Sequence, residues 1–106
     1  MLLAGNNAKL NLVDKGTYGA TQGPRLETAM EIRRMQQDGC DMVGMTGMPE
    51  TALARELELH YASCAVVANW AAGKGASTIT MADVEANLKV GMKNVRKLLE
   101  SVMEVL

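Results

Sequence analysis

The sequence has 106 residues, of which 48% are hydrophobic and 22% charged, a composition typical of a globular domain that excludes a disordered chain. Its 11 basic and 12 acidic residues give a net charge of −1, so charge supplies no footprint for binding nucleic acid or an anionic membrane. The longest apolar run is far too short to span a bilayer, and no signal peptide is visible. We therefore expect one domain, residues 1–106, with no nucleic-acid or membrane partner.

Residues able to hold a metal are few. The sequence has one histidine, His60, and two cysteines, Cys40 and Cys64, without metal-ligand spacing. We expect no metal site, His60 at the surface, and reduced thiols in a cytoplasmic protein. Nine methionines and the absence of phenylalanine suggest adaptable apolar packing.

The first half of the chain is predicted to alternate strands and helices. Residues 8–14 and 17–21 have the composition of short strands joined across a turn at Gly16. A helical pattern begins at Leu26 and is expected to end at Gly39. The apolar run 41–45 is predicted to be a strand.

The second half continues this alternation. Pro49 and Glu50 suit the first turn of a helix running to about Leu57, and the apolar run 61–68 is typical of a strand buried on both faces. Residues 70–77 are predicted to be a loop. Thr80 and Asp83 resemble a capping box that begins a long amphipathic helix. Its apolar stripe comprises Val84, Leu88, Met92, Val95, Leu99, Val102 and Leu106.

The order strand, strand, helix, strand, helix, strand, helix predicts an α/β fold with a mixed, partly parallel sheet of three or four strands. Ligands bind such sheets beyond the carboxyl ends of the strands. Three segments would lie there: residues 22–28, residues 44–50 and Asn69.

Each segment also has a purely structural interpretation. Glu27 could be a charge in the first turn of a helix, Thr46 could cap the next helix, and Asn69 could bond to nearby backbone at the end of a strand. Residues 73–77 (GKGAS) look like a phosphate-binding loop but lack the full spacing of one.

The motifs GTY at 16–18, GPRLET at 23–28 and GCDMVGMTGMPE at 39–50 resemble the carboxyl half of the trimeric purine nucleoside phosphorylases, a family that includes methylthioadenosine and methylthioinosine phosphorylases. The similarity extends over about residues 16–106. It implies the carboxyl-terminal portion of a three-layer fold in which helices flank the sheet. It also implies a homo-oligomer and phosphorolysis of a purine nucleoside, with inorganic phosphate as co-substrate and no cofactor.

The resemblance assigns roles to individual residues. Asn69 matches the catalytic residue that faces N7 and the 6-substituent of the base, and Glu27 matches the carboxylate that accepts from N1–H of a 6-oxopurine. Leu26 matches the residue that stacks on the base, and Met45 the one under the ribose. Thr46 matches a hydroxyl that holds phosphate.

Met81 aligns near the residue that faces the 5′ position, where an apolar side chain suits a methylthio group. The resemblance therefore favours 5′-methylthioinosine as substrate, with inosine or guanosine as the alternative. The family's glycine-rich phosphate loop and its phosphate-binding Arg and His are not visible here. We expect the chain alone to be an inactive fragment, or alternatively a non-catalytic α/β module that self-associates.

Overall fold

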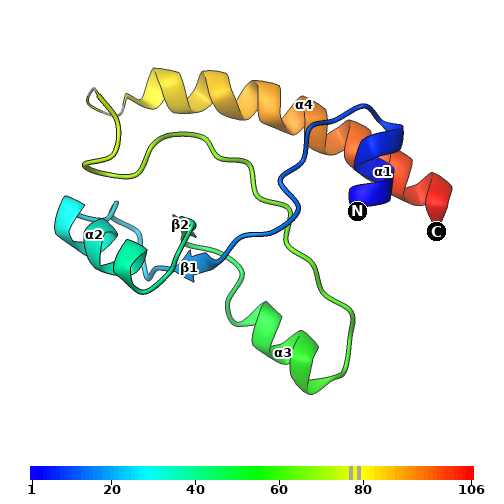
Figure 1. Ribbon diagram of the computed structural model, residues 1–106, viewed down its shortest axis with the longest axis horizontal. Helices are drawn as coiled ribbons and strands as arrows, with labels where there is room; N and C mark the ends of the chain where they lie inside the picture. Colours follow the sequence, from blue (N-terminus) through cyan, green and yellow to red (C-terminus); the bar gives the residue numbers. More distant parts are fainter. Residues whose placement is uncertain (77, 79) are drawn as a thin grey trace. The chain divides into compact units, whose positions relative to one another are not determined.

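A computed structural model describes residues 1–76, 78 and 80–106 (Figure 1). The chain is an α/β protein and divides into two compact units. Unit 1 comprises Met1–Lys15, Val66–Trp70 and Thr78–Leu106, and unit 2 comprises Gly16–Ala65 and Ala71–Ser77. The elements in chain order are α1 (Leu2–Asn7), β1 (Tyr18–Ala20), α2 (Ala29–Gln37), β2 (Met42–Gly44), α3 (Glu50–Glu56) and α4 (Met81–Val105).

Unit 2 is built on a parallel pair of strands. β1 pairs with β2 so that Tyr18 lies opposite Met42 and Ala20 opposite Gly44. The chain between them forms α2, because two parallel strands need a crossover connection. The strands at 17–21 and 41–45 are thus confirmed in shortened form. The expected hairpin is wrong, since residues 8–14 form no strand and the partner of β1 is β2.

Helix α2 begins three residues later than predicted, at Ala29. The side chain of Thr28 accepts a hydrogen bond from the backbone N–H of Glu31, and the Glu31 side chain accepts one from the backbone N–H of Thr28. This reciprocal capping box satisfies donors that the first turn leaves unpaired and fixes the start of the helix. Ile32 and Met35 then bury the inner face.

Unit 1 consists largely of α1 and α4. Leu98 of α4 is only 2% exposed, and Ala4 and Gly5 of α1 are buried. A side chain at Gly5 would meet Leu12 and reach Leu98, so a glycine permits the close approach. Helix α1 was not predicted from the sequence, because its residues Gly5, Asn6 and Asn7 are weak helix formers.

The start of α4 is confirmed. Thr80 is its N-cap and accepts a hydrogen bond from the backbone N–H of Asp83 at 3.2 Å. The predicted apolar stripe divides in two: Val84, Val95 and Val102 are half-buried, whereas Leu88, Met92, Leu99 and Leu106 are exposed.

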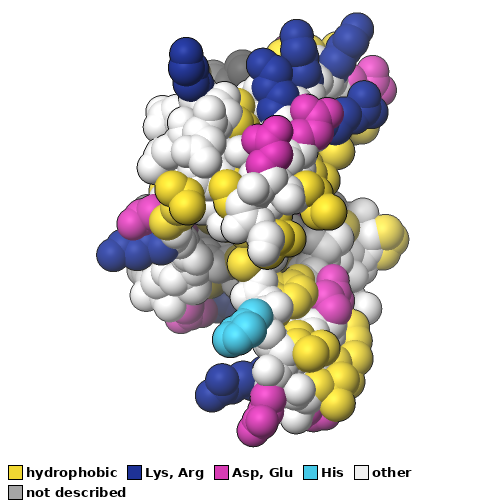
Figure 2. Space-filling view, turned by 90° about the vertical axis from the view of Figure 1, so that its right-hand side faces the viewer, with side chains coloured by type: hydrophobic (Ala, Val, Ile, Leu, Met, Phe, Trp, Pro, Cys, Tyr) yellow, Lys and Arg dark blue, Asp and Glu magenta, His cyan; other side chains and the backbone are white. Residues whose placement is uncertain are grey.

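The predicted strand at 61–68 is wrong, because these residues have no regular secondary structure. A strand needs a neighbour to satisfy its backbone groups, and the sheet in the described part of the chain contains only β1 and β2. Tyr61 is 44% exposed and Val67 is 71% exposed. Figure 2 shows several groups of hydrophobic side chains among polar and charged ones on the face that it presents. In the described residues the sheet has two strands, fewer than the three or four expected.

Candidate functional site

The carboxyl ends of β1 and β2 bring two of the predicted segments together. The N–H of Thr21 donates to the carbonyl oxygen of Gly44 at 2.8 Å, which extends the parallel pairing by one step beyond Ala20. The chain leaves this edge toward Glu27 on one side and toward Met45 on the other. This is the edge of an α/β sheet at which ligands bind.

Glu27 lies before helix α2, so the alternative role as a first-turn charge is wrong. Its half-buried carboxylate accepts a hydrogen bond of 2.6 Å from the hydroxyl of Thr21. The Thr21 hydroxyl also lies 3.2 Å from the carbonyl oxygen of Gly44. The carboxylate is therefore tied to the end of the sheet.

Met45 lies against the loop that leads to Glu27. Gly23 has a φ of +63°, and a Cβ there would come within 2.6 Å of the Met45 sulfur. The close approach and the left-handed backbone both require glycine. Met45 remains 40% exposed and Leu26 is 59% exposed, so both offer apolar surface to a ligand.

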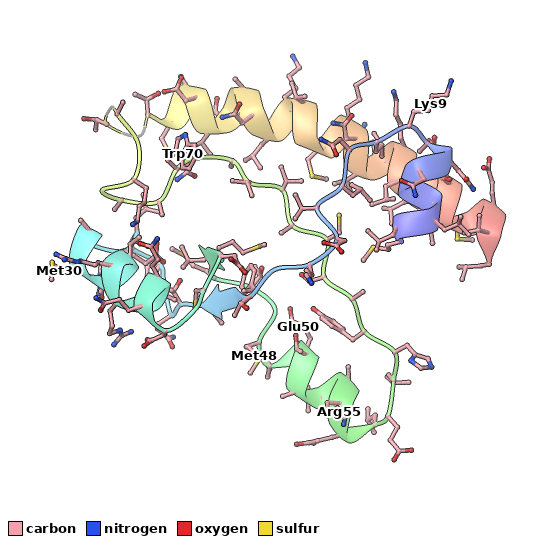
Figure 3. All side chains as sticks on the ribbon, in the orientation of Figure 1. Lys9, Met30, Met48, Glu50, Arg55 and Trp70 are labelled. Carbon is pink, nitrogen blue, oxygen red and sulfur yellow. The ribbon has the colours of Figure 1, made fainter. Side chains whose placement is uncertain are left out.

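Thr46 bonds to a tyrosine and not to the next helix. Its hydroxyl lies 3.1 Å from that of Tyr18, and its backbone N–H donates to the same tyrosine oxygen at 3.3 Å. The N-cap of α3 is Pro49, so the interpretation of Thr46 as a helix cap is wrong. Glu50 does occupy the first turn, near Met48, with Arg55 at the other end of α3 (Figure 3).

An ion pair supports the loop that carries Leu26 and Glu27. The guanidinium of Arg25 donates to both carboxylate oxygens of Glu31, at 2.8 and 3.0 Å, and to the carbonyl oxygen of Leu26 at 3.1 Å. The backbone N–H and the hydroxyl of Thr28 also donate to Glu31, at 2.7 and 2.9 Å. Mainly through Arg25, and then through Thr28, these bonds lower the pKa of Glu31 from its ordinary 4.5 to about 2. The Glu31 hydrogen bond in turn raises the pKa of Arg25.

Asn69 and Met81 belong to unit 1. The side-chain amide of Asn69 donates to the carbonyl oxygen of Trp70 at 2.8 Å, a bond to nearby backbone of the kind considered as its alternative role. The preceding residue, Ala68, accepts from the Asn87 amide of α4 at 2.8 Å. Trp70 is 73% exposed. Met81, the first residue of α4, is 69% exposed.

Four residues that bond to the predicted site residues or brace their loop were given no role from the sequence: Tyr18, Thr21, Arg25 and Glu31. The pattern Thr-x-x-Glu at residues 28–31 is a capping-box signal and could have revealed Glu31. The contacts of Tyr18 and Thr21 depend on pairing β1 with β2, which local sequence does not specify.

The structure also describes His60 and most of the stretch that looked like a phosphate loop. His60 (cyan in Figure 2) is exposed, and no cluster of three metal-ligating side chains occurs among the residues that were placed. Lys74, in the stretch that looked like a phosphate loop, bonds to Gln36, while Ser77 of that stretch lies outside the described residues. None of the described helices combines the length and hydrophobicity of a membrane span.

Comparison with known proteins agrees with the resemblance. The chain belongs to the phosphorylase superfamily, whose family model matches residues 3–104. A probable S-methyl-5′-thioinosine phosphorylase of Pseudomonas syringae pv. tomato is 60% identical over 85% of this chain and 37% of its own length. A second protein of that name, from Xylella fastidiosa, is 50% identical over 96% of this chain and 42% of its own. A 6-oxopurine nucleoside phosphorylase of Pyrococcus furiosus is 42% identical over 93% of this chain and 37% of its own. The chain therefore spans about two fifths of the length of these relatives.

Proposed function

We propose that this chain is the part of a purine nucleoside phosphorylase that binds the base and the sugar, with 5′-methylthioinosine as the preferred substrate. In the reaction an oxygen of hydrogen phosphate bonds to C1′, the C1′–N9 bond breaks, and the purine leaves with the bonding electrons. The proton of the phosphate passes through solvent to a ring nitrogen of the departing purine. The products are hypoxanthine and 5-methylthioribose 1-phosphate. The observation that carries the proposal is the Glu27 carboxylate, held by Thr21 at the strand edge from which Met45 and Thr46 also emerge.

Glu27 explains the preference for a 6-oxopurine. An ionised carboxylate only accepts hydrogen bonds, and a 6-oxopurine presents a donor, N1–H. An adenine presents an acceptor at N1, so its complex would set two acceptors against each other. A site built around a polar partner rejects an analogue that lacks it strongly.

The other assigned residues take the roles that the resemblance gives them. Asn69 stabilises the charge that develops at N7 as the base leaves, a contact that is strongest in the transition state. Leu26 stacks on the base, Met45 lies under the ribose, and Met81 faces the 5′ substituent. The exposed apolar surface of these three side chains supports this assignment.

Titration calorimetry with 5′-methylthioinosine and 5′-methylthioadenosine tests base recognition, because these ligands share a sugar and differ at the 6 position. We expect the 106-residue chain to prefer the 6-oxopurine at least about tenfold, since a missing partner leaves a buried polar group unpaired. Glu27→Gln removes the preference, and the exposed Glu56→Gln of α3 keeps it. Equal binding of the two ligands, or binding of neither, contradicts the proposal.

Inosine is the alternative substrate, and the similarity to the Pyrococcus furiosus enzyme supports a 6-oxopurine in either case. Including inosine in the same titration experiment distinguishes 5′-methylthioinosine from inosine as the preferred substrate. Tighter binding of 5′-methylthioinosine supports the role of Met81, and tighter binding of inosine contradicts it.

Phosphate is held less completely than the nucleoside in this chain. Thr46 is the one phosphate-binding residue that the resemblance assigns, and a single hydroxyl cannot orient a phosphate dianion for attack. The isolated chain therefore binds nucleoside without phosphorolysis. Phosphate-dependent hypoxanthine release should not exceed that of a Thr46→Ala, Asn69→Ala variant. Release well above that level would contradict the proposal that the isolated chain binds nucleoside without phosphorolysis.

In the whole protein the chain forms the carboxyl-terminal portion, as a single domain, of a three-layer fold with a mixed sheet, and it assembles as a homo-oligomer. The apolar side chains left exposed on α4 and at its C-cap, among them Leu99, Met103 and Leu106, support burial against further structure. The competing hypothesis is a self-associating module without chemistry. A stable oligomer that binds no nucleoside would favour that hypothesis.

A further inference from the structure

We propose that Thr21 is a positioning residue that aims the Glu27 carboxylate and thereby sets the preference for 6-oxopurines. This inference rests on the proposed function of Glu27 and names a second residue on which that function depends. Its basis is the 2.6 Å hydrogen bond from the Thr21 hydroxyl to one oxygen of the Glu27 carboxylate.

The geometry indicates where the Thr21 proton lies. A hydroxyl has one proton, and the two acceptors near it are the Glu27 carboxylate at 2.6 Å and the Gly44 carbonyl oxygen at 3.2 Å. The shorter, charge-assisted bond is the stronger of the two. Thr21 therefore donates mainly to Glu27.

Thr21 is itself rigidly placed. Its backbone N–H bonds to Gly44 at 2.8 Å, so the residue continues the parallel pairing of β1 with β2. A β-branched side chain has restricted χ1 rotamers, which limits where the hydroxyl can point. The donor is thus anchored to the sheet and not to the loop that carries Glu27.

The backbone on both sides of Glu27 is also fixed. Arg25 donates to the carbonyl oxygen of Leu26 at 3.1 Å, and the N–H of Thr28 donates to Glu31 at 2.7 Å. These bonds hold the main chain, and the Thr21 bond holds the end of the Glu27 side chain. One carboxylate oxygen is then occupied and the other can receive N1–H of the base, a preorganised arrangement that avoids ordering a flexible side chain on binding.

The test measures the ratio of affinities for 5′-methylthioinosine and 5′-methylthioadenosine in variants of the 106-residue chain. Thr21→Val removes the hydroxyl and keeps the shape, and it should lower the ratio about tenfold, as loss of a hydrogen bond to a charged group does. The loss should fall on the 6-oxopurine ligand alone. Thr21→Ser retains the hydroxyl and should keep most of the preference.

The same substitution in a Glu27→Gln background should leave the ratio unchanged, because Thr21 acts through the carboxylate. Equal weakening of both ligands by Thr21→Val would indicate a structural role and overturn the inference, as would an unchanged ratio. Thr21→Ala is the second variant if circular dichroism shows that Thr21→Val misfolds. If the unsubstituted chain shows no 6-oxopurine preference, the proposed function itself has failed. If Glu27→Gln abolishes the preference and Thr21→Val and Thr21→Ala do not alter it, only the role of Thr21 has failed.

Discussion

Acid should loosen the loop that carries Leu26 and Glu27, because protonation of the Glu31 carboxylate weakens its bonds to Arg25 and Thr28. Its pKa is about 2 in the folded chain against an ordinary 4.5. A group whose pKa is depressed by folding stabilises the folded state above its unfolded pKa and loses that contribution as pH falls toward the folded value. The contribution of Glu31 is therefore complete above pH 4.5 and lost between 4.5 and about 2.

The two pKa values predict a large difference in protonation. At about pH 3.25 an ordinary glutamate would be about 95% protonated and Glu31 only about 5%. The Arg25–Glu31 pair is exposed, with side-chain exposures of 67% and 37%, so high salt should weaken the part due to Arg25. The bonds from Thr28 depend less on salt because they are local to the helix start.

Carbon-13 NMR of labelled glutamate carboxyls measures this titration directly, with the Glu31 signal identified by its absence in Glu31→Gln. We expect a midpoint near 2 that rises in Arg25→Ala, and rises less in Thr28→Ala, since the Arg25 hydrogen bonds are the largest cause. Arg55→Ala, which removes a cation from α3, should leave it unchanged. A midpoint at the ordinary value, or one that Arg25→Ala does not move, would refute this reasoning.

Two further predictions concern unit 1. Leu98→Ala should destabilise the chain in urea by about 3 kcal/mol, because it empties a buried site, whereas Leu99→Ala, at 55% exposure, should change stability by less than about 0.5 kcal/mol. Equal effects would mean that α1 does not pack on Leu98. Asn87→Ala removes the donor to Ala68 and should lower the fluorescence anisotropy of Trp70, the only tryptophan, whereas unchanged anisotropy would show that this bond does not hold the segment.

Local signals predicted much of the secondary structure. The Thr80–Asp83 pattern located the start of α4, and the apolar run at 41–45 located β2. A helix cap depends on residues within one turn of each other, and a short apolar run is visible in the local sequence, so these two features can be predicted without knowledge of distant contacts. The resemblance supplied Glu27, Met45 and Thr46, and the structure brings these to one edge of the sheet.

Features that depend on distant partners could not be predicted in this way. The apolar run at 61–68 suits a buried strand, but a strand forms only where a neighbour pairs with it. The partner of β1 is β2 across the whole of α2, and not the preceding residues 8–14. Thr21 becomes a donor to Glu27 only through this long-range pairing, which explains why its role was missed.

The most direct test of the central claim is to map where 5′-methylthioinosine binds on the isotope-labelled 106-residue chain by NMR. We predict that the largest shifts fall on the backbone amides of residues 21–23, 25–28 and 45–46, at the carboxyl ends of β1 and β2, and that they diminish in Glu27→Gln. Shifts confined to other surfaces, or none at saturating ligand, would contradict it.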